Sequence, residues 1–220
     1  MPPLTHNEFV PALGFRFLTR LYDPLMRWTM REQTFKEALL KQAAIAAGQR
    51  VLDLGCGTGT LTLLVKQRAP GTEVYGVDID PTALEIARRK FERMGVELQL
   101  DQARTSLLPY ADATFDRVIS SLVFHHLRPE EKRQTACEIL RVLRPGGELH
   151  VADWGRPQNV LLRAAFLTVQ ALDGFATTDE NVRGALPNAF TAAGFADVSA
   201  TQQFATAFGT VELLRARRAE

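Results

Sequence analysis

The feature that most constrains the fold of this chain is the run VLDLGCGTGT at residues 51–60, in which three glycines alternate with other residues. Its apolar first half is typical of a buried strand and contains Asp53, whereas Gly55, Gly57 and Gly59 interrupt that strand. Glycine accepts a positive φ and lets a ligand approach the backbone closely. Leucines at helical spacing follow, and a helix that begins at such a turn points its free N–H groups at whatever lies over the turn. The run therefore predicts a strand, a tight turn and a helix that together bind a ligand.

Strand-like apolar runs alternate with helical patterns along the rest of the chain. Strands are expected at 50–55, 74–79, 96–100, 115–122 and 148–154, and helices at 58–69, 81–94, 129–143, 158–173 and 180–193. Two late β stretches, at 197–204 and 207–216, follow each other so closely that they predict an antiparallel hairpin. This order favours an α/β fold, in which a parallel sheet is covered by helices on both faces. Ligands of such sheets bind at the carboxyl ends of the strands.

The composition narrows the class of protein and its partners. With 46% hydrophobic and 23% charged residues among 220, the chain can form one large globular domain, and a net charge of +1 gives no electrostatic reason to expect a nucleic-acid partner. Cys56 and Cys137 are expected to be reduced thiols, and because no His, Cys, Asp or Glu cluster has metal-ligand spacing, no metal is expected. No stretch approaches the about 20 apolar residues of a membrane span, and the N-terminus lacks the layout of a signal peptide. The expected location is therefore the cytoplasm.

The spacing of the glycines indicates which nucleotide the turn accepts. In a dinucleotide-binding G-x-G-x-x-G motif the third glycine comes one residue later, at the position that Thr60 occupies here. No Gly-Lys-Ser/Thr sequence follows, which excludes a triphosphate-binding loop. Asp78 stands nineteen residues after Gly59, at the end of the second expected strand, where a carboxylate can accept hydrogen bonds from both hydroxyls of a ribose. The pattern favours a nucleoside without a diphosphate and leaves a nicotinamide-dependent oxidoreductase as a disfavoured alternative.

Four segments, taken in order, resemble the motifs of class I S-adenosylmethionine-dependent methyltransferases, and especially the group that includes the ubiquinone/menaquinone biosynthesis methyltransferases. The segments are VLDLGCGTGT, VYGVDID, LPYADATFDRVISSLVFHHL and LRVLRPGGELHVADW. The resemblance is strong over residues 50–155 and extends to the C-terminal hairpin in layout. It implies a Rossmann-like fold, with a seven-stranded, mostly parallel sheet and an antiparallel last strand, and it implies S-adenosyl-L-methionine as the cofactor.

The resemblance also implies which residues hold that cofactor. The Gly55–Gly59 backbone would pack under the methionine moiety, and Asp53 would hold the loop and meet the ammonium group. Asp78 would bind the ribose, and Ile79 would lie against the adenine. The full set of candidate cofactor residues is Tyr22, Asp53, Gly55, Cys56, Gly57, Thr58, Gly59, Asp78, Ile79, Ala103, Arg104, Thr105, Ser120 and Ser121.

The sequence departs from the family pattern at the adenine position. In many relatives an Asp-Ala pair four residues before a Leu-Pro contacts the adenine amino group, and here that place is taken by Arg104 and Thr105. An arginine cannot accept a hydrogen bond from an amine. We therefore expect the adenine contact to come from the backbone near Ala103–Thr105 or from Asp101.

Methyl transfer needs a general base only if the acceptor must lose a proton. His125 and His126, just after the fourth expected strand, are the candidate catalytic residues, and Asp153 and Trp154 end the fifth strand at the same edge of the sheet. In the alternative interpretation, the two histidines only cap the strand end and contact the cofactor loop.

Residues 1–45 are expected to form an N-terminal helical cap or lid, and residues 46–220 the S-adenosylmethionine-binding methyltransferase domain. Large apolar side chains alternate with arginines over 9–40, a mixture that suits a lid near the cofactor or a peripheral contact with a membrane surface. Core packing against the sheet is the third interpretation.

The sequence thus predicts methyl transfer to a small, apolar or aromatic acceptor, quinol-like or lipid-like, at oxygen, carbon or nitrogen. A non-catalytic S-adenosylmethionine-binding regulatory domain is the alternative. Methylation of nucleic acid is disfavoured, because the chain lacks the Asn/Asp-Pro-Pro-Tyr/Phe motif of amino-methylating enzymes. No oligomeric state is indicated.

Overall fold

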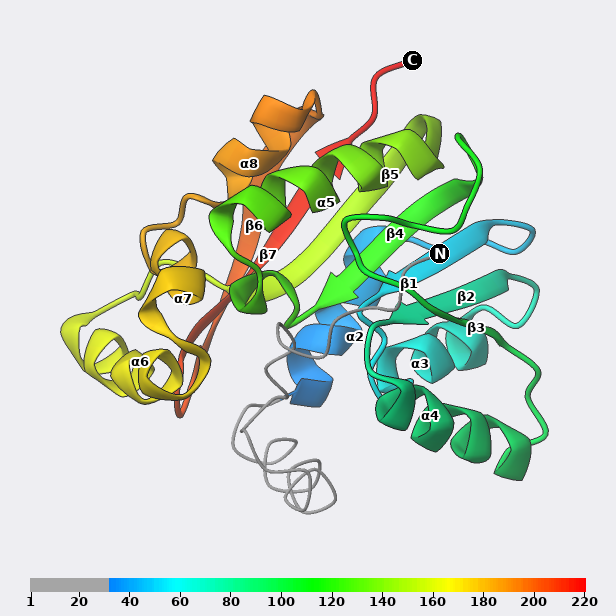
Figure 1. Ribbon diagram of the computed structural model, residues 1–220, viewed down its shortest axis with the longest axis horizontal. Coiled ribbons are helices and arrows are strands. Elements are labelled where there is room, and N and C mark those ends of the chain that lie inside the picture. Colours follow the sequence, from blue (N-terminus) through cyan, green and yellow to red (C-terminus); the bar gives the residue numbers. More distant parts are fainter. Residues whose placement is uncertain (1–31) are drawn as a thin grey trace, which may run out of the picture.

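A seven-stranded sheet runs through the middle of the part of the chain that the structure describes, residues 32–220 of a computed structural model (Figure 1). The strand order is β3-β2-β1-β4-β5-β7-β6. The strands are β1 Arg50–Leu54, β2 Glu73–Asp78, β3 Gln99–Gln102, β4 Phe115–Ser121, β5 Leu143–Trp154, β6 Ala196–Thr206 and β7 Gly209–Arg217. The first five pair in parallel, and β7 lies antiparallel between β5 and β6. The predicted Rossmann-like sheet with an antiparallel last strand is confirmed.

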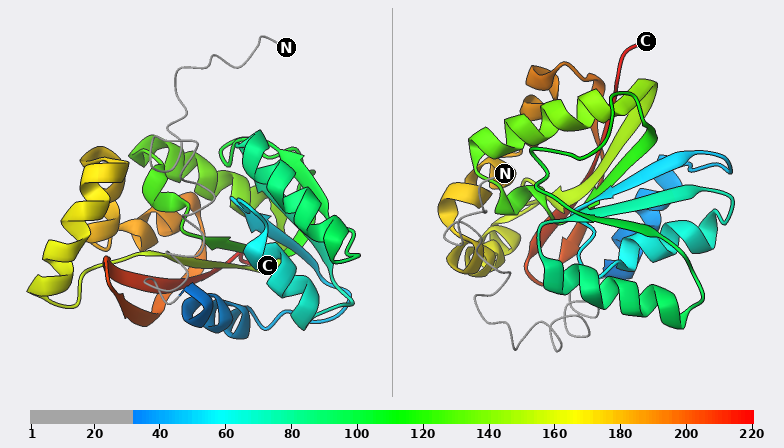
Figure 2. Two further views of the ribbon diagram at one scale, coloured as in Figure 1. Left: turned by 90° about the horizontal axis from the view of Figure 1, so that it is seen from below. Right: turned by 45° about the vertical axis from the view of Figure 1, so that its right-hand side comes forward.

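Helices cover both faces of the sheet, as Figure 2 shows. One face carries α2 Glu32–Ala43 and α3 Thr60–Arg68, with α4 Pro81–Arg93 packed against α3, and the other carries α5 Pro129–Val142 and α8 Leu186–Ala193. Because successive side chains of a strand point to opposite faces of the sheet, each strand contributes to the cores on both faces. Val51 of β1 packs into the α2–α3 core, whereas its neighbour Leu52 packs into the α5–α8 core.

The remaining elements gather at the carboxyl ends of the parallel strands. A 3-10 turn, η1 Phe124–His126, follows β4, and α6 Val160–Asp173 and α7 Phe175–Val182 follow β5. α7 contacts η1, and α6 contacts β7 (Figure 1). The η1 turn and the helices α6 and α7 therefore lie at the edge where a ligand of this fold binds.

Local sequence signals set several of these boundaries. Asp80 caps α4 by accepting a hydrogen bond from the backbone N–H of Thr82 at 2.8 Å, and Pro81 occupies the first helical position, as the sequence predicts. The expected helix at 180–193 is wrong, because Gly184, with φ +68°, separates α7 from α8. The expected start of the fifth strand at 148 is also wrong, since the chain is already extended at Leu143, which pairs with Phe115 before a register shift.

The N-terminal cap is described only in part. Tyr22 and most of the apolar 9–40 segment lie outside the described residues. Within α2, Phe35, Leu39 and Ala43 are fully buried in the sheet core, so this portion of the expected cap packs as core. Among residues 32–220, no helix is both long and apolar enough to cross a bilayer.

Candidate active site at the carboxyl edge of the sheet

The glycine loop between β1 and α3 is tied to the neighbouring strand by its backbone. The N–H groups of Gly55 and Cys56 both donate to the carbonyl of Val77, at 2.8 and 3.0 Å. Gly55 has φ +70°, and a Cβ there would lie 2.3 Å from a methyl carbon of Val123, so the loop after β4 packs directly on this glycine. Gly57 differs, because no described atom lies within 4 Å of the place its Cβ would occupy. The loop therefore presents an open backbone surface at Gly57.

Asp53 lies beneath this loop with its carboxylate almost fully buried. The hydroxyl of Thr62 donates to Oδ2 of Asp53 at 2.6 Å. Burial raises the pKa of Asp53 from 3.8 to about 6, an effect that the Thr62 hydrogen bond and the positive charge of Lys36 partly offset. A buried carboxylate held by a hydroxyl is well suited to a ligand ammonium, which would supply a full positive charge. The residue thus fits the role that the resemblance implies.

Asp78, at the end of β2, is the second acidic group of the loop. Its Oδ2 accepts the backbone N–H of Gly57 at 2.7 Å, and its Oδ1 accepts that of Asp80 at 2.9 Å. Burial raises the pKa of Asp78 despite these hydrogen bonds. Because a carboxylate offers about four lone-pair positions, Asp78 keeps acceptor capacity for a ribose hydroxyl. The half-buried Ile79 follows directly, where an adenine would lie.

The expected adenine side is built mainly from backbone. The N–H of Ala103 donates to the carbonyl of Asp78 at 3.1 Å, which brings the chain after β3 beside the ribose position. The Thr105 hydroxyl bonds that of Thr135 on α5 at 2.9 Å, and Asp101 accepts the hydroxyl of Tyr110 at 3.0 Å. Both side chains are therefore committed to protein partners. The partly exposed backbone of Ala103–Thr105, which includes Arg104, remains for an adenine.

The structure shows which groups of three further candidates are already bonded or buried within the protein. Ser120 is fully buried, and its hydroxyl donates to the carbonyl of Leu54 at 2.9 Å, so this side chain binds within the sheet rather than at a ligand. The Ser121 hydroxyl is buried and has no hydrogen-bond partner among residues 32–220. The Cys56 thiol packs against Gly76 of β2, and burial raises its pKa. Only the backbone of Cys56 is left for the loop's ligand.

Asp153, the carboxylate near the end of β5, organises the segment after β4. Its Oδ2 accepts the backbone N–H groups of Val123 and Phe124, at 2.9 and 2.7 Å. Its Oδ1 accepts from His125 Nδ1 at 2.9 Å and from the side-chain amide of Asn181 at 3.2 Å. Burial alone would raise the pKa of Asp153, but the interaction with His125 and the backbone N–H groups lower it below its usual value. The anionic Asp153 thus fixes the His125 tautomer with a proton on Nδ1.

Asp173, at the end of α6, faces both histidines. Its Oδ2 lies 3.7 Å from His125 Nε2, and its Oδ1 lies 3.9 Å from His126 Nδ1. The two imidazole rings are 3.9 Å apart between centroids. His125 is buried, whereas 41% of the His126 side chain is exposed. Desolvation and the neighbouring His125 lower the pKa of His126, so this ring is neutral near pH 7.

Sequence reasoning missed the partners that α6 and α7 contribute. Asp173 faces the histidines and Asn181 donates to Asp153, both from segments with no motif. Lys132 of α5 is fully buried, with its Nζ 2.8 Å from Asn181 Oδ1. Phe166 of α6 and Phe190 of α8 are fully buried core residues. The large side chains exposed next to the cluster are Leu172 and Phe175, which flank Asp173.

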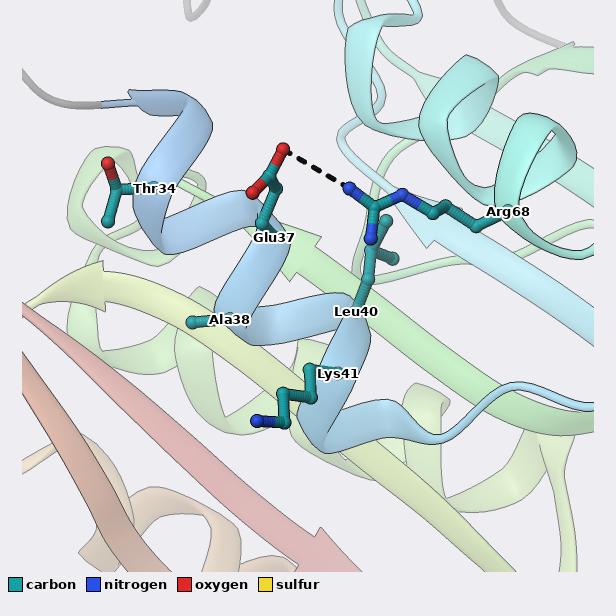
Figure 3. A pocket seen from close by; sticks show the side chains of 6 residues that line it. All are labelled: Thr34, Glu37, Ala38, Leu40, Lys41 and Arg68. Atoms are coloured by element: carbon teal, nitrogen blue, oxygen red, sulfur yellow. Dashed lines mark ion pairs between the residues drawn. The ribbon is translucent and has the colours of Figure 1, made fainter.

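A shallow pocket on the outer face of α2 is separate from this edge. It is lined by Thr34, Glu37, Ala38, Leu40, Lys41 and Arg68, and Figure 3 shows the ion pair of Glu37 and Arg68 across it, at 3.2 Å. None of the loop or histidine residues lines it.

Comparisons with known proteins point to one family. Residues 51–147 match a family model described as a methyltransferase domain. The demethylmenaquinone methyltransferase of Thermus thermophilus is 44% identical over 153 residues, which are 69% of this chain and 64% of that protein. An uncharacterized methyltransferase of Synechocystis sp. is 30% identical over 186 residues, 84% of either chain. The matched part spans between 53% and 64% of three demethylmenaquinone methyltransferases.

Solved structures agree on the fold. A protein of Pyrococcus horikoshii superposes with a TM-score of 0.70 at 20% identity, over 93% of this chain and 100% of that one.

Proposed function

The chain belongs to the class I S-adenosylmethionine-dependent methyltransferases, and on this premise we propose that it transfers a methyl group from S-adenosyl-L-methionine to a small aromatic acceptor of the quinol type. The demethylmenaquinone methyltransferases among its relatives support this class of acceptor. The non-catalytic regulatory alternative and the nicotinamide alternative have no support among these relatives.

One observation supports the proposal: the loop of Gly57 lies between a buried carboxylate, Asp53, and a half-buried one, Asp78, which suit the two ends of the cofactor. Asp53 lies under the loop where an ammonium would meet it, and Asp78 bonds the Gly57 N–H while keeping acceptor positions for ribose hydroxyls. When bound there, S-adenosylmethionine supplies an electrophilic methyl group on a sulfonium, which an acceptor atom displaces in line.

The chain's own residues contribute mainly position and exclusion of water. The Val123 side chain packs on Gly55, and Asp153 accepts the backbone N–H groups of Val123 and Phe124. The loop after β4 is therefore fixed against the glycine loop. Such positioning accelerates a displacement with a good leaving group. The cluster of His125, His126 and Asp173 lies at the same edge and would receive a hydroxyl of the acceptor.

The surroundings of that cluster favour an apolar ring. Leu172 and Phe175, on either side of Asp173, are 60% and 57% exposed. In this proposal, the two side chains would contact the apolar ring of the acceptor. The expected N-terminal lid would complete this contact in this proposal; within the expected cap of residues 1–45, α2 packs as core, and residues 1–31 lie outside the described part of the chain.

The decisive experiment couples binding to turnover. Wild-type protein is mixed with S-adenosylmethionine and a panel of reduced naphthoquinones, other phenols and lipids, and S-adenosylhomocysteine release is measured. We expect turnover with quinols. Cofactor binding in calorimetry without turnover on any acceptor would instead favour the regulatory alternative, and the absence of binding would refute the proposal.

A glycine pair provides the matched variants. Gly57→Ala adds a methyl group on the open face of the loop, and Gly95→Ala adds one at the end of α4, also at positive φ with no neighbour within 4 Å. Both carry a similar backbone strain of about 1–2 kcal/mol. We expect Gly57→Ala to weaken S-adenosylhomocysteine binding at least about tenfold, whereas Gly95→Ala leaves binding unchanged. Equal binding by both variants would show that the ligand does not lie over Gly57.

A further inference from the structure

The contacts of Asp173 pose a problem that the proposed methyl transfer does not resolve. With the His125 proton on Nδ1, held by Asp153, His125 Nε2 offers a lone pair toward a carboxylate oxygen of Asp173 at 3.7 Å. The His126 ring likewise places Nδ1 at 3.9 Å from the other oxygen. Both separations exceed a hydrogen bond. In these tautomers the two ring nitrogens and the carboxylate present lone pairs to one shared space, an arrangement that suits a cation.

We propose that His125 Nε2, His126 Nδ1 and Asp173 bind a divalent transition-metal ion of the Zn²⁺ type. Within the described part of the chain, one ligand atom from each residue lies within 4.8 Å of the other two. Two imidazoles and one carboxylate are the ligands of known catalytic zinc sites, whose metal–ligand distances are about 2.0–2.2 Å. Ligand atoms on a shared metal are therefore roughly 3–4 Å apart, close to the two measured separations.

Hydrogen bonds from neighbouring residues orient the proposed ligands. Asp153 holds the Nδ1–H of His125, the arrangement by which proteins orient a metal-binding imidazole and raise its basicity. Asp153 is held in turn by Asn181 and by the backbone of Val123 and Phe124. His125 and Asp173 are buried or half-buried, and the exposed His126 ring can adjust to close the set.

Three protein ligands leave a coordination position open. This part of the inference rests on the proposed function: a hydroxyl of the acceptor would take the open position, and the metal would lower its pKa so that the proton passes to solvent. A metal at this place would make a free histidine base unnecessary. The sequence did not predict a metal, because Asp173 stands 47 residues beyond His126 and carries no ligand spacing.

The test measures metal binding on its own, apart from activity. Metal-depleted full chain is titrated with Zn²⁺ by calorimetry and with Co²⁺ by visible absorption, whose intensity reports the coordination geometry. We expect one ion per chain, bound with low-symmetry Co²⁺ bands. Asp173→Asn and His126→Ala should each weaken binding by more than about tenfold, since even residues behind the ligands contribute that much.

Asp179→Asn is the matched control. It removes the same charge from an exposed carboxylate of α7 that pairs with Arg183, and it should bind the metal as wild type does. Binding of S-adenosylhomocysteine by each variant shows that the site edge is folded. Wild-type protein that binds neither ion at one per chain, or an Asp173→Asn variant that binds with unchanged affinity, would overturn the inference. Metal binding without any S-adenosylhomocysteine binding would instead refute the proposed function and leave this site standing.

Discussion

Asp53 is a buried carboxylate whose loss of hydration is only partly offset by its protein partners. Its side chain is 1% exposed, and its pKa is raised to about 6. In the unfolded chain the same group ionises near 3.8. Between these two values the folded state holds a proton that the unfolded state has released. The free energy of unfolding therefore falls as the pH rises through this window.

The prediction for Asp53 concerns stability and binding together. Asp53→Asn keeps an oxygen for the Thr62 hydroxyl but removes the buried charge, so it should raise the free energy of unfolding at pH 7 by about 1–3 kcal/mol. It should also weaken S-adenosylhomocysteine binding, because the ligand ammonium loses its partner. Urea unfolding at pH 4 and pH 7 measures the first effect, which should be absent at pH 4.

Calorimetry across pH 5–7.5 measures the second effect. Wild-type affinity for S-adenosylhomocysteine should increase as the pH rises through 6, and the Asp53→Asn affinity should not. Equal pH profiles for both proteins would show that Asp53 does not meet the ammonium.

At the scale of elements, α5 and α7 are joined through one buried lysine. Lys132 Nζ donates to the carbonyl of Thr177 at 2.7 Å and to Asn181 Oδ1 at 2.8 Å, and it lies 3.5 Å from Glu180. Burial lowers the pKa of Lys132, and the neighbouring Glu180 opposes that shift. Since Asn181 also donates to Asp153, this lysine supports the histidine cluster from behind.

Lys132→Met should release α7 before it affects the rest of the fold. The variant leaves three acceptors on α7 without their donor, which should cost about 2–3 kcal/mol. Hydrogen exchange followed by mass spectrometry should show faster exchange over residues 175–182 than over α5. Arg133→Ala, which removes the exposed neighbour paired with Glu130, is the control and should change stability by less than about 0.5 kcal/mol. Unchanged exchange of α7 in the methionine variant would exclude this supporting role.

The same helices show how far the sequence could predict this structure. Strand–helix alternation and the Asp80–Pro81 cap are local signals, and the elements that carry them were predicted to within a few residues. The break at Gly184 was missed, because apolar spacing continues across it. A single glycine does not by itself separate a kink from a helix end.

The site divides in the same way. Asp53 and Asp78 lie in motifs, so their positions beside the loop followed from the sequence. The inward turn of Ser120 depends on its pairing with Leu54, a register that no local pattern specifies. Asp173 reaches the histidines only because α6 ends beside η1, a tertiary arrangement without a sequence signal.

At the scale of the whole molecule, the end of the chain is fastened to its middle by Arg218. Its guanidinium Nη1 donates to the carbonyls of Leu140 and Arg141 at 3.0 Å and to that of Leu143, which lie where α5 ends and β5 begins. Its backbone exchanges hydrogen bonds with Gly146 and Gly147.

Arg218→Ala should therefore destabilise the whole domain by about 1–2 kcal/mol. Arg217→Ala is the matched control, since Arg217 pairs with the exposed Asp197 at 3.1 Å and should contribute less than about 0.5 kcal/mol. Thermal and urea unfolding of the three proteins provide the comparison. Identical unfolding midpoints for the two variants would show that water replaces the hydrogen bonds of Arg218 to these carbonyls without loss of stability.

The position of β7 has a consequence for how the protein is made. β7 follows the other six strands of this sheet along the chain, yet it lies inside the sheet, between β5 and β6. While the ribosome is still adding residues 209–217, one edge of β5 has no partner, and an open strand edge is a template for pairing with other nascent chains. Emergence of β7, rather than of the glycine loop, is therefore the event that closes this sheet.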